Sequence, residues 1–219
     1  MVITRIERQK KNPRRVNIFC DDEFTVGVHE DVLLKAGLRK GDTLDEHRLH
    51  ELELHEEENL ARERSFRFIG YRQRSEKEIR TKLLQNEFLP SIIDSTIIYL
   101  KNLGYVDDRA FAEAYVHDTL MKKPSGKRLL RRQLRLKGIA VDIIDDVLQK
   151  IGNEEELSLA REAARKHVKR SGTSRKPSIH RNAGERLKQR KRLADYLARR
   201  GFAWDTVSLV VKELFNQSS

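Results

Sequence analysis

The sequence predicts a mainly α-helical protein: an elongated tandem array of three three-helix repeats, preceded by a small N-terminal β-hairpin or sheet. Two observations lead to this prediction. A helical pattern of apolar residues recurs three times, and a run of alternating apolar residues lies ahead of it. Repeated units of this size bury their cores within themselves and against their neighbours. Stacked in tandem, they give a curved body whose long surface suits an extended partner.

The recurring pattern starts at Ser75, Gly126 and Gln189. Counted from each start, apolar residues stand at offsets four, eight and thirteen, and a second group stands at offsets eighteen, twenty-two and twenty-five. The positions are Ile79, Leu83, Phe88, Ile93, Ile97 and Leu100, then Leu130, Leu134, Ile139, Ile144, Leu148 and Ile151, then Leu193, Leu197, Phe202, Val207, Val211 and Leu214. Each group has the spacing of one amphipathic helix, so every copy contains two.

A third helix leads each repeat, and it completes the predicted domain organisation. The leading helices cover approximately residues 60–71, 110–122 and 158–170. Helix formers run from residue 45 without glycine or proline until Gly70, which predicts one long helix or two abutting ones. The predicted domains are a strand-rich extension (1–44), an acidic helix with the first repeat (45–106), the second repeat (107–153) and the third repeat (154–219). Within the last domain, residues 171–184 are small, polar and basic, which predicts a mobile loop.

Glycine marks the expected end of the middle helix in two of the copies. Gly138 and Gly201 stand at offset twelve, where a helix commonly ends in a left-handed residue. Glu87 occupies this place in the first copy. Because glycine adopts the left-handed conformation most readily, we expect a weaker cap there.

The N-terminal segment has the alternation of a β-hairpin. Apolar residues alternate from Val16 to Cys20 and again from Phe24 to Val28, on either side of an acidic turn, and residues 2–6 fit a third strand. Residues 29–38 then predict a short helix that ends near Gly37, and residues 40–42 a turn. Cys20 is the single cysteine, which excludes an intramolecular disulfide and indicates a small buried apolar residue.

Charge indicates the class of partner. The formal net charge of +11 and the isoelectric point near 9.8 favour nucleic acid, an anionic membrane or an acidic protein surface. The charge is uneven, because residues 45–58 are rich in acid whereas residues 122–137 contain eight basic residues and no acidic one. The first residues lack the apolar core of a signal peptide, and no apolar run is long enough to cross a bilayer. We therefore expect a cytoplasmic protein that does not engage a membrane.

Two helices carry basic faces, which form the candidate binding site. Arg128, Arg131, Arg132 and Arg135 fall within an arc of about 100°, opposite the apolar positions of their helix. One repeat later, Lys188, Lys191, Arg192 and Arg199 also face away from apolar positions. Arginine suits phosphate or carboxylate, so two such faces could follow a polyanionic backbone. The alternative is a pair of solvated faces that only keep the protein in solution.

No other motif indicates chemistry. Asp107 and Asp108 fit a helix N-cap better than a metal site, and Phe202 and Trp204 fit core anchors better than base-stacking platforms. The histidines at positions 47, 50 and 55 fit a solvent-exposed face, because zinc sites need a tighter ligand set. A glycine-rich phosphate loop, a nucleophile elbow and a Cys–His pairing are all missing from the sequence. We expect no enzymatic activity, no metal and no cofactor.

Several segments together resemble one known family. They are GYVDD (104–108), FAEAYV (111–116), SGKRLLRRQLRLKGI (125–139), RSEKEIRTKLL (74–84) and LADYLARRGF (193–202). In this order along the repeats they resemble the RecX family of bacterial recombination regulators, over approximately residues 60–215. The N-terminal hairpin and the insert at 171–184 depart from the shortest family members.

The resemblance implies a non-enzymatic regulator, usually an inhibitor, of the RecA recombinase, active in DNA recombination, DNA repair and the SOS response. Similar proteins are thought to lie in the helical groove of the RecA filament on DNA and to block its extension and strand exchange. The implied partners are the RecA filament and DNA, single- or double-stranded, with weak sequence preference, and we expect a monomer. Two rival interpretations stay open: an autonomous nucleic-acid-binding protein, and a helical adaptor that binds its partner through apolar grooves.

Overall fold

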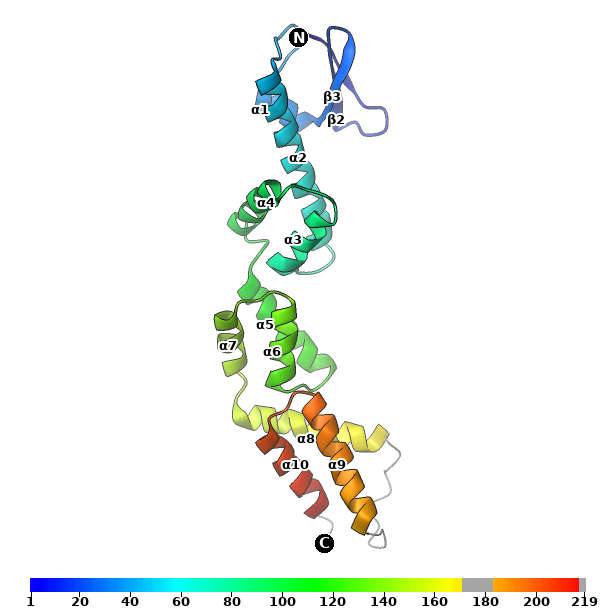
Figure 1. Cartoon of the computed structure of the whole chain (residues 1–219), viewed down its shortest axis with the longest axis vertical. Helices are drawn as coiled ribbons and strands as arrows, with labels where there is room; N and C mark the ends of the chain where they lie inside the picture. Colours follow the sequence, from blue (N-terminus) through cyan, green and yellow to red (C-terminus); the bar gives the residue numbers. More distant parts are fainter. Residues whose placement is uncertain (171–182, 217–219) are drawn as a thin grey trace. The chain divides into compact units, whose positions relative to one another are not determined.

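The structure is a computed structural model that describes residues 1–170 and 183–216. The described residues form three strands followed by ten helices (Figure 1). The chain divides into two compact units, Met1–Val106 and Asp107–Ser219. This mostly helical architecture with a small N-terminal sheet confirms the predicted fold class.

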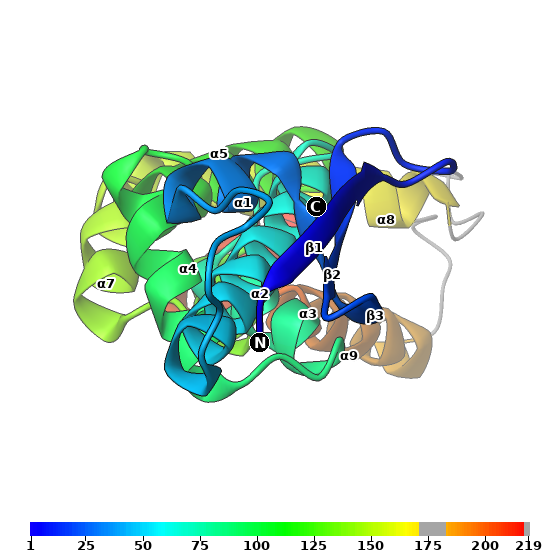
Figure 2. The same cartoon turned by 90° about the horizontal axis from the view of Figure 1, so that it is seen from above.

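The three strands form one antiparallel sheet in the order β1-β2-β3. They are β1 (Ile3–Arg8), β2 (Arg15–Cys20) and β3 (Glu23–His29), and Figure 2 shows them side by side. The turn between β2 and β3 places Asp21 and Asp22 at φ of 48° and 70°. A two-residue hairpin turn of type I′ needs positive φ at both central residues, and aspartate tolerates this conformation better than most residues do. The predicted hairpin and its third strand are confirmed.

The sheet packs on α1 (Glu30–Ala36) and on the first half of α2 (Glu46–Ile69). Gly37, at φ of 65°, ends α1 as predicted, and Cys20 is buried in the shared core. The core residues of this part are Ile3, Val16, Ile18, Cys20, Val28, Val32, Leu38, Leu44 and Leu52. The sequence predicted one long helix or two abutting ones after residue 45, and the continuous α2 shows that there is one. The three histidines of the acidic stretch are exposed along it, as predicted.

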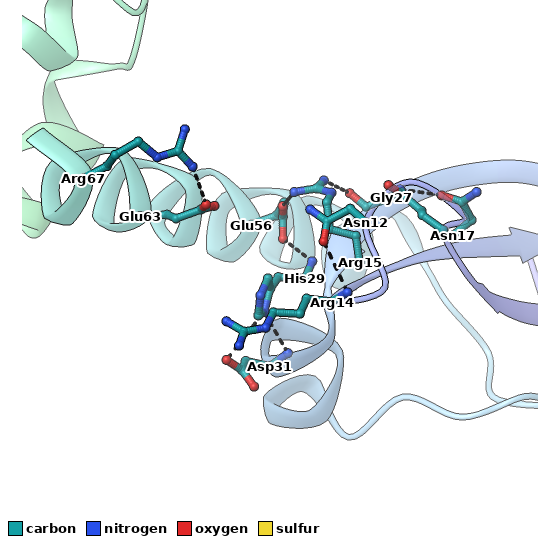
Figure 3. A network of polar contacts seen from close by, with 11 residues as sticks. Asn12, Arg14, Arg15, Asn17, Gly27, His29, Asp31, Glu56, Glu63 and Arg67 are labelled. Atoms are coloured by element: carbon teal, nitrogen blue, oxygen red, sulfur yellow. Dashed lines mark hydrogen bonds and ion pairs between the residues drawn. The ribbon is translucent and has the colours of Figure 1, made fainter.

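A buried carboxylate fixes the sheet to α2 (Figure 3). Glu56 is 6% exposed and accepts hydrogen bonds from the Arg15 guanidinium and from the His29 backbone N–H, the latter at 2.6 Å. Arg15 also donates to the Gly27 carbonyl at 2.8 Å. A buried charge is tolerated when it is paired and fully hydrogen-bonded, and here the pairing connects two strands to one helix.

The second half of α2 forms the first repeat with α3 (Glu76–Leu84) and α4 (Pro90–Asn102). Ser75 and Glu78 form a capping box at the start of α3. All six apolar positions of the first copy are buried, which confirms the periodicity.

Glu87 adopts the conformation that glycine adopts in the other two copies. Its φ is 65°, against 84° at both Gly138 and Gly201. In all three copies the next residue donates its backbone N–H to the carbonyl five residues earlier, at 3.1 to 3.3 Å. The first copy therefore keeps the same cap geometry, at a strain of about 1–2 kcal/mol for a residue with a Cβ.

The described residues of the second unit form the remaining six helices. α5 (Asp108–Lys122), α6 (Lys127–Leu136) and α7 (Val141–Gln149) share one core, and α8 (Asn153–Arg170), α9 (Ala183–Arg199) and α10 (Trp204–Asn216) share another. Asp107 caps α5 as predicted, because its carboxylate accepts from the backbone N–H groups of Arg109 and Ala110 at 2.8 and 3.0 Å. Residues 171–182 of the predicted insert lie outside the described residues, and 183–184 begin α9.

One predicted core anchor is wrong. Phe202 is 1% exposed and lies in the core, but Trp204 is 61% exposed. Trp204 is the first residue of α10, and the first residues of α4 and α7, Pro90 and Val141, are exposed as well. The position faces solvent in every repeat, so the repeat geometry outweighs the hydrophobicity of the side chain.

Candidate functional site

The basic face of α6 offers three unpaired guanidinium groups. Leu130 and Leu134 are buried on the opposite side of the helix. Arg128, Arg132 and Arg135 are exposed, and among the described residues no acidic side chain forms an ion pair with any of them. With no acidic partner to neutralise them, all three are available to an anionic ligand.

Arg131, the fourth predicted residue of this face, is already neutralised. Its Nη2 lies 2.7 Å from Oδ1 of Asp145 on α7. The Arg131 side chain is about two-fifths exposed, so the pair contributes about 0–1 kcal/mol to stability. Its guanidinium points toward α7, and the ion pair connects α6 to α7.

The α9 face is exposed as well. Lys188, Lys191, Arg192 and Arg199 are all solvent-accessible, whereas Leu193 and Leu197 are buried. Arg199 donates to the Asp195 carbonyl of its own helix at 3.3 Å. Within the part of the chain that the structure describes, none of the four cations forms an ion pair with a carboxylate.

A contact between two glycines joins α9 to α6. The N–H of Gly126 donates to the Arg200 carbonyl at 2.9 Å, and the N–H of Arg128 donates to the Gly201 carbonyl at 3.1 Å. A Cβ on Gly126 would lie 2.3 Å from backbone atoms of Gly201, and one on Gly201 would lie 2.2 Å from the backbone nitrogen of Leu129. Both positions therefore require glycine.

The contact also satisfies the ends of both helices. No side chain caps the N-terminus of α6, and the carbonyl groups that follow α9 accept its N–H groups instead. The positive end of one helix dipole meets the negative end of the other. As Figure 1 shows, α9 ends where α6 begins, so the two basic helices follow one another within the second unit.

Side chains reinforce this junction from both sides. The Arg200 guanidinium donates to the Pro124 carbonyl and to the Ser125 hydroxyl, the latter at 3.3 Å. Glu156 of α8, 7% exposed, accepts from the Lys127 backbone N–H at 3.4 Å and lies 3.8 Å from its ammonium group. The junction is therefore held by backbone, by a buried carboxylate and by a guanidinium fork.

The end of α8 adds charge beside the α9 face. The His167 ring stacks on the Tyr196 ring with centroids 4.0 Å apart and planes 15° apart. Partial burial lowers the pKa of the His167 imidazole below its usual value, and the guanidinium groups of Arg199 and Arg170 lower it further. These two arginines thus lie close enough to repel a proton on His167.

Sequence reasoning missed His167, Arg170 and the role of the two glycines. From the sequence, Gly126 was interpreted only as the start of a repeat and Gly201 only as a helix cap. A signal was present, because Gly126 occupies the position at which the first copy has the capping residue Ser75. Glycine has no side chain to cap a helix, so the free N–H groups of the first turn need hydrogen-bond acceptors from elsewhere in the protein.

No helix in the described part of the chain is both long enough and apolar enough to span a bilayer. Three family models match the chain. They are the N-terminal domain of regulatory protein RecX over residues 1–45, the first RecX three-helix domain over 61–100 and the second over 107–148.

Named relatives and solved structures agree with these models. The chain is 33% identical to the regulatory protein RecX of Clostridium acetobutylicum, over 99% of this chain and 98% of the relative. It is 36% identical to that of Bacillus subtilis, over 97% of this chain and 76% of the relative. A crystal structure of regulatory protein RecX superimposes with a TM-score of 0.75 at 26% identity, covering 95% of this chain and 98% of that one.

The crystal structure of RecX from Lactobacillus salivarius shares the fold, with a TM-score of 0.62 at 21% identity over 73% of this chain and 97% of that one. The likeness to named relatives spans both units, the N-terminal sheet as well as the helical repeats. This chain belongs to the RecX family of regulatory proteins.

Proposed function

We propose that this protein is a non-enzymatic regulator of RecA, acting as an inhibitor, and that it binds the RecA–DNA filament with α6 and α9 facing phosphate groups. Family membership supports RecA as the target. The observation that carries the binding mode is the glycine junction, because it fixes two exposed basic helices end to end. A rigid arrangement of several weak cationic contacts raises affinity, since each contact increases the effective concentration of the next.

The spacing of the α6 cations fits a polyanion. An α-helix rises 1.5 Å per residue, so Arg128 and Arg132 stand about 6 Å apart along the axis, and Arg128 and Arg135 about 10 Å apart. The α9 cations continue the series on the other side of the junction. Guanidinium groups bind phosphate oxygens in a forked geometry without reading the base, so weak sequence preference follows.

The test is RecA-catalysed ATP hydrolysis on single-stranded DNA, with this protein added below stoichiometry. We expect inhibition by the wild type and a loss of at least tenfold in potency for R128A/R132A/R135A. The control, R67A/K77A/K82A, removes the same number of exposed positive charges from the first repeat, where Arg67 pairs with Glu63, and should inhibit as the wild type does. If the wild type leaves both hydrolysis and filament length unchanged at moderate salt, the proposal is wrong.

An autonomous nucleic-acid-binding protein is the second candidate, and the same unpaired cations favour it. Neutralising about six phosphates makes log affinity fall with log salt with a slope of about −4 to −6. DNA binding without any effect on RecA would support this candidate. If the triple variant keeps its DNA affinity but no longer inhibits RecA, the α6 face contacts protein. An adaptor that binds through apolar grooves would be indifferent to salt.

A further inference from the structure

The outer face of the N-terminal sheet presents a row of one arginine and two phenylalanines. Arg5 of β1 stands opposite Phe19 of β2, which stands opposite Phe24 of β3. The inner side chains of β2, from Val16 to Cys20, are buried against α1 and α2. The row therefore lies on the face that the rest of this unit does not cover.

The three side chains pack on one another in a definite order. The Arg5 guanidinium carbon lies 4.1 Å from the centroid of the Phe19 ring. The Phe19 and Phe24 rings meet edge to face, with centroids 5.9 Å apart and planes 77° apart. Phe24 remains 60% exposed, so one aromatic ring is held in place by its neighbours while most of its surface is open to solvent.

The same segment is strongly basic. Residues 1–20 contain six basic residues and one acidic residue. Three of the cations have acidic partners: Arg5 with Glu7, Arg8 with Glu30, and Arg15 with Glu56.

The other three lie in the loop between β1 and β2. Lys10, Lys11 and Arg14 are exposed, and within the described residues no ion pair engages them. This loop and the aromatic row flank opposite ends of β2. Phe19 is four residues after Arg15 along the strand, a distance of about 13 Å. A strand of a few nucleotides can reach both.

From this arrangement we infer that the outer face of the N-terminal sheet binds single-stranded nucleic acid, a site beyond the α6 and α9 faces of the proposed function. One base stacks on the exposed Phe24 ring, and the Lys10–Arg14 loop contacts phosphates. Proteins that bind single strands without sequence preference combine these two elements, because every base has a face that can stack and every nucleotide carries a phosphate. Bases inside a duplex are already stacked on one another, so a duplex leaves the Phe24 ring without a partner.

The test measures binding of labelled oligothymidylate to the full chain by fluorescence anisotropy. The background is R128A/R132A/R135A, so that the result does not depend on the proposed function of α6. Phe24→Ala should weaken binding by about fivefold to a hundredfold, the range measured for loss of one stacked base. Phe24→Tyr should retain affinity, and a duplex of the same length should be insensitive to both changes.

Two further variants separate stacking from charge. Phe24→Leu keeps an apolar side chain but removes the aromatic face, so it should lose affinity as Phe24→Ala does. K10A/K11A should reduce the slope of log affinity against log salt by about 1.4, the value for two phosphates on a single strand. Thermal unfolding of each variant checks that the sheet is intact.

Equal affinity of Phe24→Leu and the wild type would overturn the inference, because stacking would then contribute nothing. Unchanged affinity of Phe24→Ala would overturn it for the same reason. If Phe24→Ala weakens RecA inhibition and leaves oligothymidylate binding intact, the face meets a protein surface and the inference is also wrong.

Discussion

The first and second repeats share a structural ion pair and differ at the surface around it. Arg80 of α3 lies 2.5 Å from Asp94 of α4, and Arg131 of α6 lies 2.7 Å from Asp145 of α7. The two arginines occupy one repeat position, five residues after the start of their copy, and the two aspartates occupy another, nineteen residues after it. The first and second repeats therefore share this pair, and it distinguishes Arg131 from the three unpaired arginines of its face.

The neighbouring positions carry the difference between the two repeats. α6 has Arg128, Arg132 and Arg135 where α3 has Lys77, Thr81 and Leu84. In α3, Glu76 of the first turn pairs with Arg80 and with Lys101, whereas Lys77 remains an exposed cation. The same repeat scaffold thus carries one exposed cation at these three positions in the first unit and three in the second.

The third repeat lacks this ion pair. Ala194 and Ser208 stand at its two positions, so no charge pair can form there. Lys191 stands at the position of Arg128, and the other cations of α9 come from different positions of the helix. The basic residues of α6 and α9 therefore do not follow one shared pattern. What relates the two basic helices is the glycine junction that connects them.

Disrupting the junction should have the largest effect. Gly201→Ala and Gly126→Ala each place a Cβ inside the backbone of the other repeat, so each should lower the free energy of unfolding by about 3 kcal/mol or more. The control is Gly104→Ala, where φ is 73° and open space surrounds the new Cβ, so the expected loss is about 1 kcal/mol. Urea unfolding measures all three, and equal losses at Gly104 and Gly201 would show that the contact is unimportant.

Separating Arg131 from its neighbour sharpens the comparison. Arg132→Ala should weaken DNA binding about fivefold with little change in stability, because the side chain is exposed and unpaired. Arg131→Ala should leave DNA affinity nearly unchanged and lower stability by about 0–1 kcal/mol, as Arg80→Ala should in the first repeat. Anisotropy titrations and urea unfolding provide the two measurements. A larger loss of DNA affinity at Arg131 than at Arg132 would contradict the assignment of a structural role.

The smallest expected effect concerns the helix caps. Glu87→Gly should stabilise the first repeat by about 0.5–1 kcal/mol, since it removes the strain of a left-handed residue with a Cβ and adds only the entropy of a glycine. The reverse change in the second repeat, Gly138→Glu, should destabilise by a similar amount. Thermal unfolding detects both changes. If Glu87→Gly instead destabilises the protein, the Glu87 side chain stabilises the fold by more than its backbone strain costs.

The sequence by itself determined the mostly helical repeats and the N-terminal sheet, because both follow from local periodicity. Burial of Ile79, Leu130 and Leu193 at one repeat position is a consequence of the helical period, and the turn at Asp21 follows from residue preference. The exposed basic residues of α6 were also predictable, since a helix that buries leucines on one side must expose its opposite side.

Only the tertiary structure decided how these elements meet. The contact of Gly126 with Gly201 joins positions 75 residues apart, and no local pattern reports a backbone approach over that separation. The pairing of Arg131 and the exposure of Trp204 likewise depend on which neighbouring helix lies within reach. Periodicity fixes which side of a helix is apolar, whereas packing between helices fixes which charges find partners and which remain available to a ligand.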